Sequence, residues 1–552
     1  MFYYFTDLTQ KKQLPMKNSK LKQVVTAVAL GAIVLFTSNS CKKPTDGVDL
    51  IFNTDVTDAT VSMQFINAKT GEAIGVDNSA QKVNVTIEGP NKSSVVDNAG
   101  GTNFKVANAT MTVGVKKGMA PSASNPIKFH IVAHAAGYLS TSVSVRILEE
   151  GTQHMIVRMV EVGNEPKGVA SAHDNSGTTD GSGTTTAPIT VSTPLVDSDF
   201  EKTKAVVNIP AGTQLFDENM NPVTGTITTT LVYFNNQDEA ALASFPGGFA
   251  VTTAEFGDIV FKTAGFIAME MKNQSGTEVK NFGTPIQMTV EIPAATTNEK
   301  AESVTDGMIV PIWSYEPESG KWGKESEPAI SMNSGTGKYE VTYDMIHLSY
   351  WNLDWHYAGS CYTGAKVTIN SNVTSWMSGM LKLKYADGTI HSCRNVNLEN
   401  GSSFDFMNAF PNTPMIIEAS EQPVFCEGLN STSAGSVNIA DLCSGNYTLD
   451  LTGVQSNPIP VTINATCANK PGQVIKPTAT IYARKSGACQ YEYMGEMVNG
   501  VLKTSVLKEG QTYRFYVYLG GHHLEYDKDF LIDQTEYAYD QELPADLCGM
   551  FN

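Results

Sequence analysis

The sequence predicts an all-β protein in which several β-sandwiches follow one another along the chain. Charged residues make up 17% of the 552 residues, whereas Thr, Ser, Asn and Gly are plentiful, as in secreted β-proteins. Several segments alternate apolar and polar residues with the period of two that half-buried strands require. Beyond residue 40 we find no helical pattern of convincing length. The remaining 512 residues are enough for several domains.

The N-terminal segment has the order of a secretory signal peptide, assigned to residues 1–40. A basic stretch precedes an apolar run of 13 residues, which is too short for a comfortable transmembrane helix. The basic residues are Lys17, Lys20 and Lys22, and the apolar run is Val24 to Phe36. Met16 is the expected natural start, because residues 1–15 do not belong to the pattern.

The cleavage region, Ser38-Asn39-Ser40-Cys41, resembles a bacterial lipobox, with Ser38 in the place usually held by Leu. Relaxed forms of this kind are known from Bacteroidetes lipoproteins, which the chain resembles. The resemblance implies that Cys41 is lipidated and anchors the protein to the outer membrane, with residues 41–49 as a tether. Surface display is favoured over a periplasmic-facing anchor, and both stay open. The alternative is an ordinary signal peptide cut near Ser40, in which Cys41 is incidental.

Charge and cysteine content narrow the functional classes. The formal charge is −18, and −22 without the five Lys and one Asp of residues 1–40, so binding to nucleic acid is not expected. Seven cysteines follow Cys41, all in the last third of the chain, and export to an oxidising compartment favours disulfides. Their number is odd, so one is free or pairs between chains, and connectivity stays open. They are Cys361, Cys393, Cys426, Cys443, Cys467, Cys489 and Cys548.

The first predicted domain spans 50–162. Val83, Val85 and Ile87 alternate with polar residues, as do residues 143–147, which indicates strands. The segments 66–74 (INAKTGEAI) and 136–139 (AGYL) resemble the carboxypeptidase regulatory-like β-sandwich. That resemblance implies an opening strand and turn at the first segment and a late strand after the second. It implies no catalytic residues.

Residues 163–190 are predicted to be a flexible linker. The stretch from Ser171 to Thr186 is rich in Gly, Ser, Thr and Asp and lacks the apolar surface needed to order itself. The domains on either side are therefore expected to move relative to one another.

The second predicted domain spans 191–358 and contains an ordered series of Gly/Pro turns and aromatic segments. The series resembles the ZU5-like β-sandwich of cartilage intermediate layer proteins, and more distantly that of ankyrins and netrin receptors. Its members include 209–213 (IPAGT), 245–248 (FPGG), 283–285 (GTP), 310–315 (VPIWSY) and 347–354 (HLSYWNLD). Its tryptophans are expected to fill the core.

Two further domains are predicted as immunoglobulin-like repeats, at 359–452 and 453–552. Residues 367–370 and 461–464 are both VTIN, and 440–443 and 545–548 are both ADLC. A period of roughly 95 residues with a terminal Cys has the size of an immunoglobulin-like sandwich.

Standard catalytic signatures are missing, and we predict neither a cofactor nor a metal site. His522 and His523 are adjacent and have Glu525 and Asp527 nearby. Adjacent residues on a strand face opposite sides, so both ligate one ion only from a loop. Gly520 and Gly521 favour a loop, which we interpret as a solvated loop rather than a metal site.

The sharpest chemical hypothesis concerns His347-Leu348-Ser349, which is similar to the self-cleavage motif of the adhesion-receptor GAIN domain. The similarity implies Ser349 as nucleophile, His347 as general base and cleavage of the Leu348–Ser349 bond through an N→O acyl shift. The chain departs from GAIN domains in having no cysteine between Cys41 and Cys361. The structural alternative is that His347 hydrogen-bonds a neighbouring turn.

A carbohydrate platform is a third hypothesis, because sugar rings stack on exposed aromatic rings. The candidate residues are Tyr350, Trp351, Trp355, Tyr357, Tyr513, Tyr516 and Tyr518. Tyrosines on strands are more often half-buried packing residues.

Together these observations predict a non-catalytic cell-envelope lipoprotein that acts as a binding, adhesive or structural β-sandwich module. Its expected partners are the membrane, through the lipid on Cys41, and envelope proteins or carbohydrate. The alternatives are an autoproteolytic surface protein cut at Leu348–Ser349 and a glycan-capture lipoprotein of a nutrient-uptake system.

Overall fold

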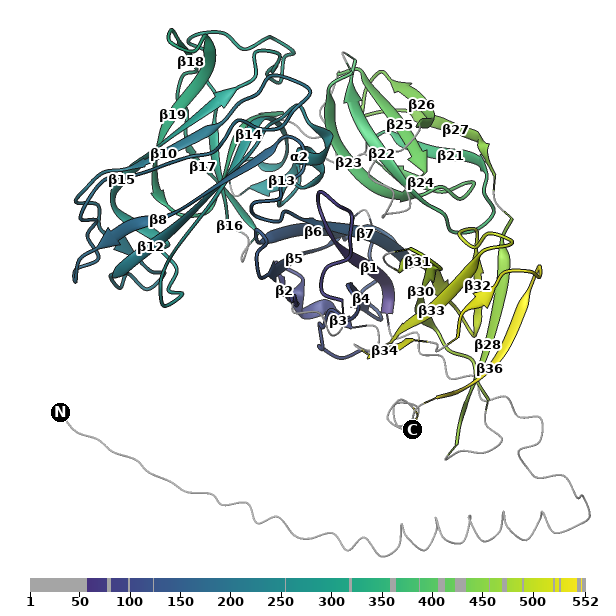
Figure 1. The fold of residues 1–552 in the computed structure, drawn as a ribbon. Coiled ribbons are helices and arrows are strands. Elements are labelled where there is room, and N and C mark those ends of the chain that lie inside the picture. Colours follow the sequence, from purple (N-terminus) through teal and green to yellow (C-terminus); the bar gives the residue numbers. More distant parts are fainter. Residues whose placement is uncertain are drawn as a thin grey trace, which may run out of the picture. The chain divides into compact units, whose positions relative to one another are not determined.

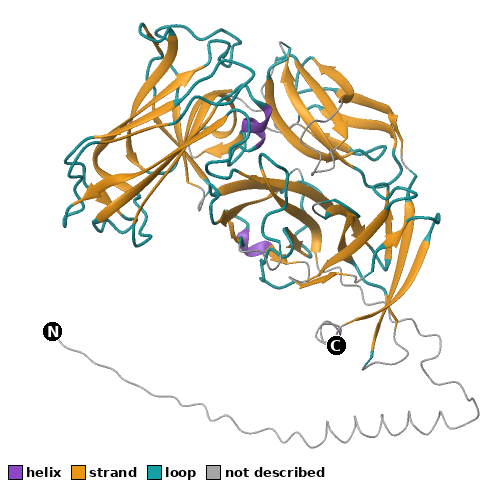
Figure 2. Ribbon diagram, in the orientation of Figure 1, coloured by secondary structure: helices purple, strands orange, loops and turns teal. Residues whose placement is uncertain are grey.

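The fold is that of a computed structural model, and its described residues are almost all in strands and loops (Figure 2). It describes residues 57–548 except 77–80, 98–99, 123, 254, 317–319, 358–363, 387, 406–412, 422–432, 456, 469–473, 489–490, 520–521, 526–527 and 544–547. Helices with described bounds are the five-residue α2 (Glu239–Ala243) and the 3₁₀ turn η1 (Lys92–Ser94). No described helix is long and apolar enough to cross a membrane. The all-β, tandem-sandwich prediction is thus confirmed.

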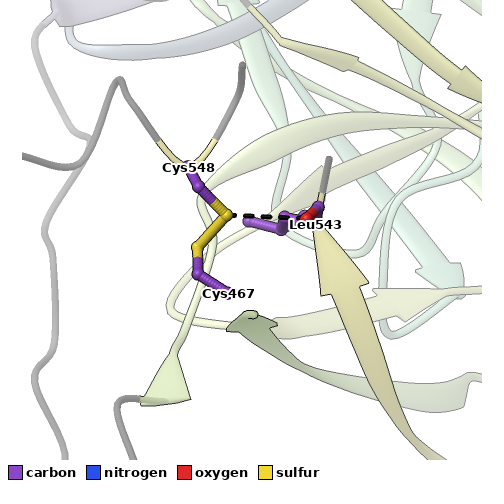
Figure 3. Close-up of a disulfide and its surroundings, with 3 residues drawn as sticks. All are labelled: Cys467, Leu543 and Cys548. Atoms are coloured by element: carbon purple, nitrogen blue, oxygen red, sulfur yellow. Dashed lines mark hydrogen bonds between the residues drawn. A yellow bond between two sulfur atoms is a disulfide. The ribbon is translucent and has the colours of Figure 1, made fainter. Parts of the chain in front are cut away.

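The chain separates into two compact units, and the larger, residues 51–465 and 475–541, contains most of the sheet (Figure 1). The described strands of the chain form eight sheets, which pair into four sandwiches. The smaller unit comprises residues 1–50, 466–474 and 542–552. It includes the C-terminal ends of β28 (Ile459–Cys467) and β36 (Tyr537–Leu543) and the disulfide between Cys467 and Cys548 (Figure 3). There the sulfur of Cys548 also lies 3.5 Å from the carbonyl oxygen of Leu543.

The first sandwich packs a four-stranded sheet (β3-β4-β1-β7) on a three-stranded sheet (β2-β5-β6). Its strands are β1 (Thr57–Asn67), β2 (Val83–Glu88), β3 (Val95–Asp97), β4 (Thr110–Lys116), β5 (Ile127–Ala135), β6 (Thr141–Ile147) and β7 (Gly151–Met159). Both segments predicted from alternation are strands, β2 and β6. In β1, Val61, Met63 and Phe65 are fully buried between the sheets, as period-two alternation requires.

The second sandwich packs a six-stranded sheet, β18-β19-β15-β10-β9 with β11 on β15, on a seven-stranded sheet, β13-β17-β16-β20-β14-β12-β8. Its strands are β8 (Val169–Thr179), β9 (Ile189–Ser192), β10 (Ala205–Ile209), β11 (Leu215–Phe216), β12 (Gly225–Phe234), β13 (Ala250–Thr253), β14 (Gly257–Asn273), β15 (Asn281–Ile292), β16 (Ile312–Glu316), β17 (Lys321–Ser326), β18 (Ser331–Asn333), β19 (Lys338–His347) and β20 (Tyr350–Tyr357).

The prediction of a flexible linker at 163–190 is wrong. β8 lies in this stretch and pairs antiparallel with β12 from Val169 to Thr179, while β9, which starts at Ile189, pairs with β10. The stretch has few apolar side chains, but a strand that adds to an existing sheet is held largely by backbone hydrogen bonds. Polar Ser and Thr residues fit such a strand where one face meets solvent.

The third and fourth sandwiches are each made of two smaller sheets. The third contains β21 (Lys366–Asn372), β22 (Ser378–Tyr385), β23 (Ile390–Asn397), β24 (Ser403–Asp405), β25 (Met415–Glu421), β26 (Ser433–Ile439) and β27 (Asn446–Gln455). The fourth contains β28 (Ile459–Cys467), β29 (Val474–Ile475), β30 (Ala479–Lys485), β31 (Glu492–Met497), β32 (Val501–Thr504), β33 (Thr512–Leu519), β34 (His522–Glu525), β35 (Phe530–Leu531) and β36 (Tyr537–Leu543). The repeated VTIN segments lie in the first strand of each, β21 and β28.

The first and second sandwiches are in contact within the larger unit, so the expected independent movement across the linker is also contradicted. The hydroxyls of Ser142 and Tyr315 lie 2.7 Å apart, and the amide of Gly247 donates to the carbonyl of Ser142 at 2.8 Å. One apolar cluster contains Leu139 of the first sandwich together with Trp313 of the second. Apolar burial therefore joins the two sandwiches.

The first and fourth sandwiches meet through a tyrosine-rich face of β30 and β33. The hydroxyl of Tyr482 lies 2.6 Å from that of Ser62, and Tyr516 donates to the carbonyl of Ala107 at 3.1 Å. Ser62 alternates with the core residues of β1, so it lies on the outer face of its sheet. That polar face is covered by the fourth sandwich instead of by solvent.

Candidate functional site

The lipidation candidate Cys41 and the whole predicted signal peptide lie outside the described residues. Lipidation therefore stays a prediction from the sequence.

The turn His347-Leu348-Ser349 carries the chain from β19 in one sheet of the second sandwich to β20 in the other. The Nε2 atom of His347 lies 3.3 Å from Oε1 of Glu325, and the amide of Leu348 donates to the carbonyl of Lys280 at 2.8 Å. The hydroxyl of Ser349 donates to the carbonyl of Tyr350 at 3.3 Å. The turn thus has partners for each of its residues. Self-cleavage stays a prediction, and in this arrangement the His347 ring is hydrogen-bonded to Glu325.

The aromatic residues proposed as a carbohydrate platform are buried. Tyr350, Trp351 and Trp355 are 4%, 1% and 5% exposed. In the fourth sandwich Tyr513 belongs to the sandwich core, and Tyr516 and Tyr518 share the face that packs on the first sandwich. Tyr357 is partly buried against the third sandwich's core cluster. The platform hypothesis is wrong for the six buried residues, because their rings do not reach solvent, and Tyr357 by itself makes no platform.

His522 and His523 lie in β34, where they pair with Leu519 and Tyr518 of β33. The loop predicted for these two histidines is therefore corrected to a strand. Across the described part of the chain, no group of three or more His, Cys, Asp and Glu residues is arranged to hold a metal ion.

The disulfide prediction is supported where the structure describes the sulfur atoms. Cys467 bonds Cys548, and Cys443 is also disulfide-bonded. Cys393 on β23 carries a free thiol. Burial raises the pKa of that thiol to about 12, so it stays protonated and is a poor nucleophile.

A cavity of about 440 Å³ opens beside the His347 turn. Its walls come from both sheets of the second sandwich: the end of β17 and the residues after it, β19 and β20. They comprise Glu325, Ser326, Glu327, Pro328, Tyr343, Asp344, Ile346 and Trp351. This volume lies within the range of roughly 300–1,000 Å³ that is typical of small-molecule sites.

Tyr343 and Trp351 form the inner wall of this cavity, and their rings are tilted relative to one another. The ring centroids of Tyr343 and Trp351 are 5.8 Å apart, and those of His347 and Trp351 are 5.0 Å apart. Period-two alternation in β19 and β20 turns Tyr343 and Trp351 into the space between the sheets. His347 does not line the cavity, but its ring packs against the indole of Trp351, which does.

The rim of the cavity is acidic. Glu325 receives hydrogen bonds from His347 and from the hydroxyl of Ser314, the latter at 2.6 Å. These bonds hold the pKa of Glu325 below its usual value, with the His347 contact as the main cause. Glu327 pairs with Lys324 at 2.6 Å, and Asp344 is exposed. Glu325 is therefore ionised at neutral pH.

The sequence contained little signal for this cavity. The sequence singles out His347 for a self-cleavage motif and Trp351 for an aromatic platform. It contains no motif at Glu325, Tyr343 or Asp344. The period-two alternation of Val341, Tyr343 and Met345 was the one available hint, and it indicates burial rather than a site.

Comparisons with known proteins find similar solved structures. No protein-family model and no curated protein matches the chain. Among solved structures, the Bacillus anthracis TIE protein is 9% identical, covering 68% of this chain and 74% of that one, with a TM-score of 0.13. The minor pilin GBS52 of Streptococcus agalactiae is 9% identical over 33% of this chain and 97% of its own, with a TM-score of 0.13. The T6 backbone pilin of Streptococcus pyogenes is 9% identical over 88% and 98%, with a TM-score of 0.11.

Proposed function

We propose that this protein is a non-catalytic, lipid-anchored component of a bacterial cell envelope, displayed at the outer membrane as an adhesive or structural module. The observation that carries the proposal is the packing of the first sandwich on the second and on the fourth. Ser142 to Tyr315 and Ser62 to Tyr482 are buried hydrogen bonds between sandwiches, and an apolar cluster spans the first two. Such contacts suit a protein that holds a surface in a fixed arrangement.

The anchor in this proposal is Cys41, on the strength of the signal peptide and lipobox-like order before it. We also propose that the first sandwich is carboxypeptidase regulatory-like and the second ZU5-like. The turn after β1, where the amide of Asn67 donates to the carbonyl of Glu72 at 2.8 Å, supports the first assignment. The ordered Gly/Pro segments between the strands of residues 191–358 support the second.

The deciding experiment is intact-mass and N-terminal analysis of protein purified from its own envelope, beside a Cys41→Ala variant. The proposal expects one chain that starts at a lipidated Cys41 and fractionates with the outer membrane, and a variant that is released from it. An unmodified N-terminus elsewhere, or a variant that stays membrane-bound, contradicts the anchor. The same spectra test self-cleavage: a fragment that begins at Ser349 and disappears in Ser349→Ala establishes it.

A further inference from the structure

The face on which the first and fourth sandwiches meet is held by contacts between hydroxyl groups. The hydroxyl of Thr112 lies 3.1 Å from that of Thr480, and the hydroxyl of Thr110 lies 3.2 Å from that of Tyr516. Water can replace either partner of such a contact, so each contributes little net free energy. Separation of the two sandwiches exposes this face but leaves the apolar core of each sandwich in place.

His154 of β7 is enclosed at the place where three sandwiches meet on this face. Its ring is 7% exposed and stacks on the ring of Tyr493 in the fourth sandwich, with centroids 4.5 Å apart and planes 4° apart. The ring of Trp376, which lies between β21 and β22 of the third sandwich, meets it edge-on at 6.2 Å. The Nδ1 atom of His154 lies 3.4 Å from the hydroxyl oxygen of Ser62. Docking of the neighbouring sandwiches is therefore what shields the imidazole from water.

An enclosed imidazole without an acidic partner is held in its neutral form. Desolvation alone lowers the pKa of His154 from 6.5 to about 3, so no described charged group compensates for the burial of the ring. The nearby tyrosines, Tyr482 and Tyr493, stay neutral because burial raises their pKa values. On the same strand the next charged residue of this face is Arg158, four positions along. Protonation of His154 therefore favours the separated state, in which water reaches the ring.

Glu496 is a second ionisable group on the docking face of the fourth sandwich, and its effect has the opposite sign. It pairs with Thr480 across β30 and β31, so it lies on the face that Thr480 turns toward Thr112 of the first sandwich. Burial raises the pKa of Glu496 from 4.5 to about 7. Ionisation of Glu496 at high pH therefore opposes docking, whereas for His154 it is protonation at low pH that does so.

We propose that the docking of the fourth sandwich on the first is a pH-gated latch, which opens when His154 takes up a proton. With His154 as the titrating group, docking keeps its full stability above pH 6.5 and loses stability as the pH falls from there toward 3. Between pH 7.5 and pH 5.0 this linkage favours opening about 30-fold. Opening exposes the tyrosine-rich face of β30 and β33. The latch goes beyond the proposed adhesive role and does not depend on lipidation of Cys41.

The test is alkylation of a cysteine placed beneath the fourth sandwich, in the purified chain from residue 41. The chain carries Glu496→Gln, which removes the opposing titration. Thr112→Cys places the thiol at a position that is 0% exposed while the sandwiches are docked. Its rate of reaction with iodoacetamide, divided by the rate for the urea-unfolded chain at the same pH, reports the open fraction, because the thiolate content cancels. Peptide mass spectrometry separates this thiol from Cys393. The ratio is expected to rise about 30-fold from pH 7.5 to pH 5.0.

Val113→Cys is the matched control. Val113 is the next residue of β4 and belongs to the core of the first sandwich, so a thiol there reports unfolding of that sandwich instead of separation. Its ratio should not follow the rise. His154→Phe keeps a ring against Tyr493 but cannot take up a proton, so the ratio measured with Thr112→Cys should become independent of pH. His154→Gln should have the same effect, and it replaces the Phe variant if that chain does not fold.

Three results overturn the proposal. The ratio for Thr112→Cys stays constant between pH 7.5 and pH 5.0, or the ratio for Val113→Cys rises in parallel, or the rise persists in the His154 variants. None of these results bears on the membrane anchor, which intact mass and fractionation decide.

Discussion

Asp354 should make the second sandwich less stable as pH rises. It lies on β20 opposite Thr263, is fully buried, and neither carboxylate oxygen has a hydrogen-bond partner of good geometry among the described residues. Burial raises its pKa from 3.8 to about 8, and the nearby Thr263 and Asn352 side chains offset part of that effect. The folded state therefore keeps the proton between about pH 4 and pH 8, whereas the unfolded chain releases it.

The sign and size follow from proton linkage. Between those pKa values the folded state binds one more proton than the unfolded state, so stability falls as pH rises, by about 1.4 kcal/mol per unit. From pH 5 to pH 8 this amounts to roughly 3 to 4 kcal/mol. Asp354→Asn removes the titration, so its stability relative to the parent chain should rise by that order across the interval.

Urea denaturation followed by tryptophan fluorescence is the assay. Trp313, Trp322, Trp351 and Trp355, four of the five tryptophans, lie in the second sandwich, so the signal reports mainly on this region. The difference between variant and parent isolates Asp354 from other titrating groups. Asp199→Asn is the control, because Asp199 forms an exposed ion pair with Lys167 and should show little change. A stability difference that stays constant from pH 5 to pH 8 refutes the reasoning.

Three further predictions concern the fourth sandwich. Replacement of Cys467 and Cys548 by Ser opens a crosslink across 81 residues and should lower the free energy of unfolding by about 4.5 kcal/mol, through loop-closure entropy. The measurement is tyrosine near-ultraviolet circular dichroism during urea unfolding. A urea midpoint equal to that of the parent chain contradicts the prediction. Glu496→Gln should gain roughly 3 kcal/mol at pH 8 and almost nothing at pH 4 in the same assay, because burial raises the pKa of Glu496 from 4.5 to about 7 and stability is lost as pH rises through that value. Tyr482→Phe removes the hydroxyl contact with Ser62 and should speed amide hydrogen exchange in β1 and β30, while exchange in β19 stays as it was.

Local periodicity predicted strands where one face meets a core. Val143, Val145 and Ile147 alternate with polar residues in β6, and the strand around Tyr513 to Leu519 is β33. The pattern succeeds because the two faces of a strand differ in burial by geometry alone. It does not say what covers the outer face, so Tyr516 and Tyr518 looked available for a ligand although the first sandwich buries them.

Composition misled where a strand depends on a distant partner. Residues 169–179 are held by β12, about 50 residues further along the chain, through backbone hydrogen bonds that do not depend on side-chain type. A stretch rich in Ser, Thr and Gly therefore looks like a linker until the sheet it joins is known.

By itself the sequence determined the all-β class and the absence of standard catalytic motifs, and it gave the expectations of an export signal and of disulfides, because composition, short-range order and period-two alternation are local properties. Only the tertiary structure decided that the aromatic residues are internal, that Cys393 is the described free thiol, and that Ser326, Tyr343 and Trp351 line one cavity. Those three residues are separated by up to 25 positions and lie at the end of β17, in β19 and in β20. Their meeting depends on how two sheets pack, and sheet packing is set by contacts between residues that are distant in sequence.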